Sequence, residues 1–119
     1  MPITAQELVA AAKQQITEID VAAANARLSG ALLLDVREPA EFAAGHLPGA
    51  VNIPRGVLEF QIGGHPAFQG KQDAGIVVYC QSGGRSALAT QVLNQLGYSG
   101  AVSMAGGFKA WAESGLKVE

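Results

Sequence analysis

The sequence is poor in cysteine: its 119 residues contain only one, Cys80. An internal disulfide is therefore excluded, and a metal cage built from thiolates is strongly disfavoured. Charged residues are also scarce, at 15% of the chain, where about a quarter is typical of soluble domains. Because hydrophobic residues reach 49%, the composition favours a compact globular fold over a disordered chain.

The chain also lacks a basic surface and a long apolar run. Its net charge is -2 and no cluster of lysine or arginine is present, so it offers no positive field that would hold nucleic acid. No apolar stretch is long enough to cross a bilayer. Residues 1–15 alternate alanine with polar residues, which is unlike a signal peptide. We therefore predict a cytoplasmic protein with no nucleic-acid or membrane partner.

Strand and helix signals alternate along a chain whose length predicts a single domain, residues 1–119. The predicted strands are short apolar runs over residues 16–19, 31–34, 50–53, 76–79 and 101–104. The predicted helices cover residues 5–14, 21–28 with Asp20 as N-cap, 39–44, 86–96 and 108–113, and a short helix with a loop occupies 55–75. This alternation predicts an α/β fold with a mostly parallel sheet and helices on both faces.

The residues that follow the predicted strands point to a site. In a parallel sheet the carboxyl ends of the strands lie at one edge, and ligands bind there. The residues expected at this edge are Asp35 with Arg37, Pro54 with Arg55, the segment 80–85, and Gly106 with Gly107. This edge would hold the only cysteine and three of the arginines. A structure with Arg37 and Cys80 at opposite edges would contradict this prediction.

The segment from Cys80 to Ser86 has the composition of an anion-binding loop. Gly83 and Gly84 permit backbone angles that are closed to other residues, so successive amide N–H groups can turn inward. The helix that follows adds unpaired N–H groups and the positive end of its dipole. Such a site lowers the pKa of a thiol, and Arg85 adds a charge able to bind an oxyanion through two hydrogen bonds. The simpler interpretation is a plain turn in which Cys80 only packs in the core. It is disfavoured because the lone cysteine, the glycine pair and Arg85 occur together at the expected site.

Several motifs follow one another in a recognisable order. They are Leu34 to Arg37, Glu41 and Phe42 followed by Gly45 to Pro54, the loop from Cys80 to Ser86, and Gly106 to Phe108 with Trp111. Each is weak alone, but together they span about residues 30–112 and closely resemble the rhodanese family. The resemblance implies a three-layer α/β/α fold with a five-stranded parallel sheet. It also implies thiosulfate sulfurtransferase activity through a cysteine persulfide.

The resemblance implies that Cys80 is the catalytic nucleophile. Its thiolate would attack the outer sulfur of a donor such as thiosulfate, and a thiol or cyanide would then accept the sulfur. The persulfide would be held by the rest of the loop, Gln81, Ser82, Gly83, Gly84, Arg85 and Ser86. This chemistry requires no metal and no cofactor. Its partners would be a small-molecule sulfur donor and a thiol acceptor, with a sulfur-accepting protein as a further partner. Gln81 is neutral where some relatives carry a cation, which leaves the physiological donor open.

Two other functions compete with sulfur transfer. Cysteine-dependent phosphatases carry one residue more between cysteine and arginine than the four, 81–84, present here. A shorter loop makes a smaller cradle that suits one extra sulfur atom, so a phosphatase or arsenate reductase ranks lower. A sulfur-relay or regulatory binding module acting on a partner protein belongs to a different class. The complete loop with Cys80 argues against pure binding, whereas a relay role stays open.

Three residues at the same edge are supporting candidates: Asp35, Arg37 and Arg55. Arg37 would add positive charge to the edge, but a structural ion pair with Asp35 or Glu38 at the strand end is the commoner arrangement and is favoured. Arg55 would either help to bind an anionic donor or lie solvated on the surface.

The histidines and the tryptophan are given structural roles. His46 is expected to be hydrogen-bonded within its turn and not to act as a base, because an ionised thiol needs none. His65 lies in a glycine-rich loop and is expected to face solvent. Phe108 and Trp111 share a short predicted helix and are expected to belong to the core.

Overall fold

The computed structural model describes residues 2–119. A five-stranded sheet forms the centre of the protein. Its strands are β1 (Glu18–Ile19), β2 (Leu32–Asp35), β3 (Val51–Asn52), β4 (Ile76–Tyr79) and β5 (Ala101–Met104). They lie in the order β1-β5-β4-β2-β3, and every neighbouring pair is parallel. The predicted fold class is confirmed, with β4 and β5 at the predicted bounds and the other strands shorter or shifted by a residue.

The helices are α1 (Ala5–Gln15), α2 (Val21–Ala26), α3 (Pro39–Ala44), α4 (Leu58–Gln61), α5 (Gly84–Gln95) and α6 (Gly107–Glu113), with 3-10 turns at Arg55–Val57 and Ile62–Gly64. Local chemistry explains two of their starts. Thr4 and Glu7 form a capping box at α1, since each side chain accepts a hydrogen bond from the backbone N–H of the other. The Asp20 carboxylate caps α2 by accepting from the N–H of Ala23. No helix within residues 2–119 is long and apolar enough to cross a membrane.

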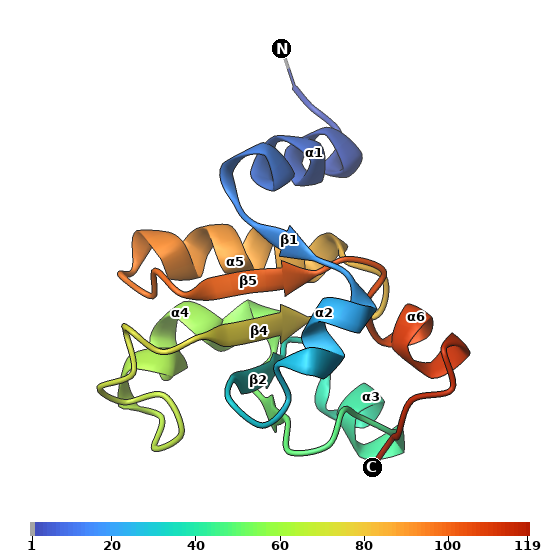
Figure 1. The fold of residues 1–119 in the computed structure, drawn as a ribbon. Coiled ribbons are helices and arrows are strands. Elements are labelled where there is room, and N and C mark those ends of the chain that lie inside the picture. Colours follow the sequence, from blue (N-terminus) through green and yellow to red (C-terminus); the bar gives the residue numbers. More distant parts are fainter. Residues whose placement is uncertain (1) are drawn as a thin grey trace.

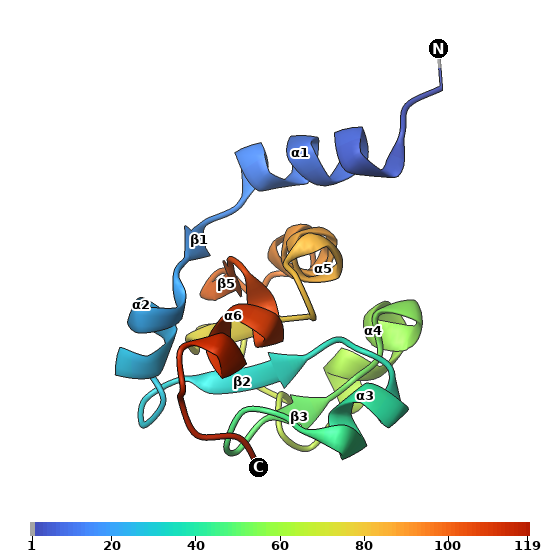
Figure 2. The same ribbon diagram turned by 90° about the vertical axis from the view of Figure 1, so that its right-hand side faces the viewer.

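The helices cover both faces of the sheet. Because successive side chains of a strand point to opposite faces, each strand contributes to two cores. Leu34 and Val78 lie in the core beneath α4 and α5, whereas Leu33 and Val77 lie in the core beneath α2 and α6. Helix α1 packs on α5 and stands outside these layers (Figures 1 and 2). The expected three-layer arrangement is therefore present, with α1 added outside it.

Two predicted helix bounds are wrong by two residues, and three others by one. The helix expected to run from the N-cap Asp20 through Leu28 ends at Ala26, because the chain turns through residues 27–30 before it enters β2. The helix expected from Ser86 begins two residues earlier, at Gly84. Gly83 lies before it with φ 112°, a conformation that favours glycine, so the helix can start within the loop.

The carboxyl ends of the strands share one edge of the sheet, as the sequence predicted. In Figure 1 this edge lies to the right, where the arrowheads point and where α3 and α6 lie. The residues after β2, β4 and β5 meet there. Arg37 Nη1 lies 3.4 Å from Gln81 Oε1, and the Phe108 N–H donates to the Cys80 carbonyl at 2.8 Å. Arg37 and Cys80 therefore lie at the same edge.

Candidate active site

Cys80 follows β4 directly and is only 1% exposed. Its Sγ accepts a hydrogen bond from the N–H of Gly83 at 3.1 Å, and the hydroxyl oxygen of Ser86 lies 3.6 Å from the sulfur. The positive φ of Gly83 turns this part of the chain back on the sulfur. The structure thus brings a backbone donor, the Gly83 N–H, and a side-chain hydroxyl, that of Ser86, onto the sulfur of Cys80.

This environment acts on the ionisation of Cys80 in two opposing ways. Burial raises the pKa of the thiol, because a thiolate is poorly solvated there. The Ser86 hydroxyl and the backbone N–H groups of Ser86, Gly83 and Ser82 lower it by stabilising the anion. The lowering effects are larger in sum, so the pKa of Cys80 lies below its ordinary value. Since the thiolate is the nucleophilic form, this site favours attack by sulfur.

The first turn of α6 docks on the carbonyl groups of the loop. The N–H groups of Phe108 and Lys109 donate to the carbonyl oxygens of Cys80 and Gln81 at 2.8 and 3.1 Å. Gly107 makes this approach possible: it has φ 61°, and a Cβ there would lie 2.5 Å from the Cys80 oxygen. The sequence placed Gly107 at this edge, but nothing in it showed how close the contact is.

Arg85 is bound to Glu41 of α3. Its Nη1 and Nη2 donate to the two oxygens of the Glu41 carboxylate at 2.7 and 3.1 Å. Both terminal nitrogens of Arg85 thus already contact a carboxylate, and the binding of a substrate oxyanion by this guanidinium stays a prediction. Glu41 lies within one of the family-like motifs, yet no role was predicted for it. Its partner is 44 residues away, so no local pattern could have paired them.

The ion pair between Glu41 and Arg85 predicts a pH-dependent stability. The hydrogen bonds from Arg85 have the largest effect on the pKa of Glu41, and they lower it. Burial raises this pKa, whereas the hydrogen bond from the Glu38 N–H lowers it, and the net result is a pKa of about 2. A depressed pKa stabilises the fold above the ordinary value of 4.5, and this contribution is lost as the pH falls toward 2. The Glu41 side chain is 33% exposed, so solvent screening limits the pair to about 1 kcal/mol.

We therefore expect Glu41→Gln to lower the free energy of unfolding by about 1 kcal/mol at pH 7. The difference from the unmutated protein should narrow below about pH 4.5 and close near pH 2, as urea unfolding at several pH values would show. Glu59→Gln, which removes the partner of Arg55, is the matched control and should cost less, because that pair joins neighbouring turns of one segment. A loss that is equal at pH 7 and pH 2.5 would contradict this explanation.

Asp35 and Arg37 form a buried ion pair, with exposures of 0% and 2%. Arg37 Nε and Nη2 both donate to the Asp35 carboxylate, the shortest contact being 2.7 Å, and Nη2 also donates to the carbonyl of Gly45. The side chain of Asn52, which the sequence did not single out, donates to the carbonyls of both residues. This is the strand-end pairing that the sequence favoured, and it leaves Arg37 little freedom to bind a substrate.

Arg55, the third supporting candidate, lies on the 3-10 turn that follows β3. Its Nη1 donates to Glu59 Oε1 at 2.9 Å. The side chains of the pair are 26% and 37% exposed, so water reaches both groups. Arg55 is therefore paired with a carboxylate, but its Nε is buried without a hydrogen-bond partner among residues 2–119, so a role in binding an anionic donor stays a prediction.

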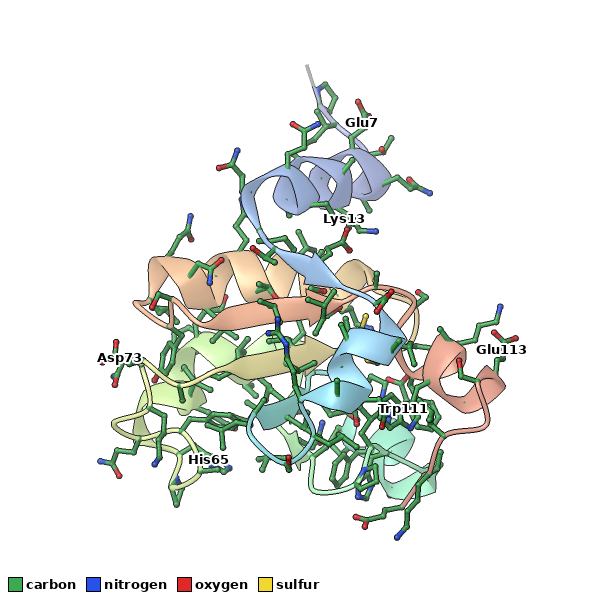
Figure 3. All side chains as sticks on the ribbon, viewed as in Figure 1. Glu7, Lys13, His65, Asp73, Trp111 and Glu113 are labelled. Atoms are coloured by element: carbon green, nitrogen blue, oxygen red, sulfur yellow. The ribbon has the colours of Figure 1, made fainter. Side chains whose placement is uncertain are left out.

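The two histidines have local roles. His46 stacks on Phe42, with ring centres 3.9 Å apart, and its Nδ1 lies 3.0 Å from the Phe42 carbonyl, which matches the structural role expected for it. His65 was expected to face solvent, but it is half-buried: its ring lies beside that of Phe68, with ring centres 5.7 Å apart, and its Nδ1 accepts from the N–H of Ala67. Figure 3 shows His65 on the side of the protein away from α6. In the part of the chain that the structure describes, no three His, Cys, Asp or Glu side chains gather as metal ligands would.

Comparison with known protein families gives one domain type. The family described as Rhodanese-like domain matches residues 12–114. A sulfurtransferase of Allochromatium vinosum is 36% identical over 106 residues, which cover 87% of this chain and 94% of that protein. The human thiosulfate:glutathione sulfurtransferase is 42% identical over 92 residues, covering 70% of this chain and 80% of that protein.

A solved structure extends the similarity over the full chain. It is that of a Rhodopseudomonas palustris protein of unknown function, described as a possible tyrosine phosphatase. Its TM-score is 0.86 at 31% identity, with 100% of this chain and 99% of that chain covered. The fold is therefore shared beyond the four motifs, and the helix before the first strand is included.

Proposed function

This chain belongs to the rhodanese-like domain family, and from that premise we propose that it is a sulfurtransferase that carries sulfur as a persulfide on Cys80. The family and its relatives named as sulfurtransferases support sulfur transfer as the class of reaction. The geometry around the sulfur is the observation that carries the specific mechanism. A Gly83 N–H at 3.1 Å and the Ser86 hydroxyl at 3.6 Å stabilise an anionic sulfur at this position.

The proposed reaction has two displacements. The Cys80 thiolate attacks the outer sulfur of thiosulfate, a new S–S bond forms, and the old S–S bond breaks with its electron pair leaving on sulfite. The Cys80 persulfide is again an anion and is held by the loop from Gln81 to Ser86. An acceptor thiolate then attacks the terminal sulfur, and Cys80 leaves as the thiolate with which the cycle began. No oxidant, metal or second cysteine takes part.

The donor and the acceptor are proposed by chemical class. We propose thiosulfate or a related sulfane-sulfur donor, and a low-molecular-weight thiol as the acceptor. The human relative supports this choice, since its name gives thiosulfate and glutathione. Each arginine at the strand-end edge already contacts a carboxylate; the pairs are Arg37 with Asp35, Arg55 with Glu59 and Arg85 with Glu41. With these charges compensated, the affinity for dianionic thiosulfate is expected to be modest.

A sulfur-accepting protein is the alternative acceptor. The same persulfide on Cys80 would serve a relay, and the first displacement would be unchanged. The two cases differ in their second step. A relay protein would form the persulfide readily but turn over slowly with glutathione or cyanide. An enzyme that acts on small-molecule acceptors would turn over with both of these acceptors.

The loop length and the burial of Cys80 support sulfur chemistry over phosphate chemistry. Four residues separate Cys80 from Arg85, and the thiol is 1% exposed. A single terminal sulfur atom needs less room at the thiolate than a tetrahedral phosphate or arsenate. Because the similar Rhodopseudomonas palustris structure is described as a possible tyrosine phosphatase, phosphatase activity is the alternative to be tested.

Lengthening the loop tests the size argument. One glycine inserted between Gly83 and Gly84 is expected to reduce sulfur transfer about tenfold or more, because it moves the Ser86 hydroxyl and the start of α5 relative to the sulfur. The matched control is one glycine inserted between Gly63 and Gly64, in a 3-10 turn with no hydrogen bond to the loop among the described residues. This variant should keep its activity. Undiminished sulfur transfer in the first variant would show that loop size does not decide the chemistry.

The function is tested by turnover with competing substrates. The purified protein is assayed with thiosulfate and either cyanide or glutathione, and sulfite release is measured. Parallel reactions contain arsenate with a thiol, or an aryl phosphate. We expect Cys80-dependent sulfite release and no turnover of arsenate or the phosphate ester. Hydrolysis of the ester that depends on Cys80, without sulfite release, would replace this proposal by a phosphatase.

A further inference from the structure

Ser103 is a buried hydroxyl in an otherwise apolar strand. Its neighbours in β5 are Ala101, Val102 and Met104, and Ser103 itself is 0% exposed. A buried hydroxyl without a hydrogen bond is costly, so its partner is informative. Ser103 Oγ donates to Ser86 Oγ at 2.9 Å, which links β5 to the first turn of α5. Among the described residues, Ser86 is the one partner of this hydroxyl.

The Ser86 hydroxyl lies between three groups. Its oxygen is 2.9 Å from Ser103 Oγ, 3.2 Å from the carbonyl oxygen of Gly83 and 3.6 Å from Cys80 Sγ. A hydroxyl has one proton to donate and two lone pairs that accept. Ser86 therefore donates either to the Gly83 carbonyl or to the sulfur, and it cannot do both.

The protonation of Cys80 decides between these two arrangements. When Cys80 is a thiol, its S–H can point to Ser86 Oγ, and Ser86 donates to the Gly83 carbonyl. When the thiol proton has gone to solvent, Sγ can only accept, and the Ser86 proton can turn to it. This second arrangement requires that Ser103 donates to Ser86 and does not compete for the Ser86 proton. The hydrogen bond from Ser103 has that direction, so the Ser86 proton is free to turn to the sulfur.

We propose that Ser103 is a positioning residue for sulfur transfer: by donating to Ser86, it leaves the Ser86 proton free for the anionic sulfur of Cys80, as thiolate and as persulfide. Ser103 does not touch the reacting atoms, and it acts only through Ser86. Hydrogen bonds in a chain polarise one another, so the bond from Ser103 strengthens the one from Ser86 to the sulfur. The inference rests on the proposed function and assigns a role to a residue outside the loop.

The charged and titratable groups near Cys80 come from other elements. They are Arg85 on α5, Glu41 on α3, Asp35 at the end of β2, Arg37 after β2, Tyr79 on β4 and Lys109 on α6. Strand β5 adds no ionisable side chain. Removing the Ser103 hydroxyl therefore leaves every charge in place, and a change in the titration of Cys80 reports on the hydrogen-bond chain.

The test is the pH dependence of Cys80 alkylation by a small reagent in Ser103→Ala. We expect the midpoint to rise by about 0.3 pH unit, because the bond from Ser103 is present with thiol and thiolate alike and only its strengthening of the bond from Ser86 to the thiolate is lost. Persulfide formation from thiosulfate should fall about twofold below the midpoint and recover above it. Ser103→Thr keeps the hydroxyl and should restore the midpoint.

Thr90 provides a matched control. It lies on α5, is 0% exposed, and its hydroxyl has no hydrogen-bond partner within residues 2–119. Thr90→Val therefore also removes one buried hydroxyl, but without touching the chain to the sulfur. Its alkylation midpoint should equal that of the unmutated protein. An equal shift in both variants would mean that packing, and not the Ser103 hydroxyl, sets the midpoint, and it would overturn the proposal.

A double mutant tests whether Ser103 acts through Ser86. In a Ser86→Ala background, Ser103→Ala should produce no further shift, because the link to the sulfur is already broken. An additional shift of the same size, or an unchanged midpoint in Ser103→Ala alone, would overturn the proposal. Alkylation does not require sulfur transfer. If the unmutated protein formed no persulfide, the proposed function would fail while the titration still decided the role of Ser103.

Discussion

Cys80→Ser is expected to reduce sulfur transfer by roughly a thousandfold or more, which is the loss that follows removal of a nucleophile that bonds to the substrate. A serine hydroxyl is hardly ionised near neutral pH and cannot form a persulfide. Sulfite release from thiosulfate, with cyanide as acceptor, measures the loss.

The fold of this variant should be intact, which makes the loss of activity interpretable. Serine is slightly smaller than cysteine, and its oxygen can still accept a hydrogen bond from the N–H of Gly83. The melting temperature should therefore remain close to that of the unmutated protein. A folded Cys80→Ser variant that retained a tenth of the activity would show that Cys80 is not the sulfur carrier.

Gly107→Ala is expected to destabilise the fold by about 3 kcal/mol and to abolish sulfur transfer. The positive φ of Gly107 disfavours any other residue, and the added Cβ would lie 2.5 Å from the carbonyl oxygen of Cys80. That carbonyl accepts from the N–H of Phe108, so relief of the clash must separate α6 from the loop. Urea unfolding measures the first effect, and sulfite release per folded molecule measures the second.

Gly100→Ala separates the two effects. An added Cβ at Gly100 would also meet a backbone oxygen, that of Ala74, but at the opposite end of β5 from the loop. We expect a comparable loss of stability with sulfur transfer per folded molecule nearly unchanged. Equal losses of activity in the two variants, or an active Gly107→Ala protein, would contradict the role assigned to the contact between α6 and the loop.

Much of the fold follows from short-range patterns in the sequence. The apolar runs of β4 and β5 have their predicted bounds, because buried parallel strands show as continuous apolar segments. The α3 bounds, Pro39–Ala44, were also predicted, since proline opens a helix and Gly45 follows it. The predicted strands and the parallel-sheet rule suffice to place Cys80 and Arg37 at one edge of the sheet from the sequence alone.

Contacts between distant residues were not predictable in this way. The partner of Arg85 is Glu41, and the partner of Ser86 is Ser103, each on another element. A serine within the apolar strand β5 was a visible signal, but its partner depends on how α5 packs on the sheet. His65 was expected to be exposed because glycines surround it, but it is half-buried beside the ring of Phe68. The single domain over residues 1–119 and the cytoplasmic location stay predictions.

The most direct test of the central claim is the intact mass of the reduced protein after incubation with thiosulfate, beside Cys80→Ser treated in the same way. We expect the unmutated protein to gain the mass of one sulfur atom and the variant to gain none. Cyanide or a thiol should remove the added sulfur. If thiosulfate gives no gain, small persulfide donors are tried next. An unchanged mass with every sulfur donor, or a gain that persists in Cys80→Ser, would contradict the account.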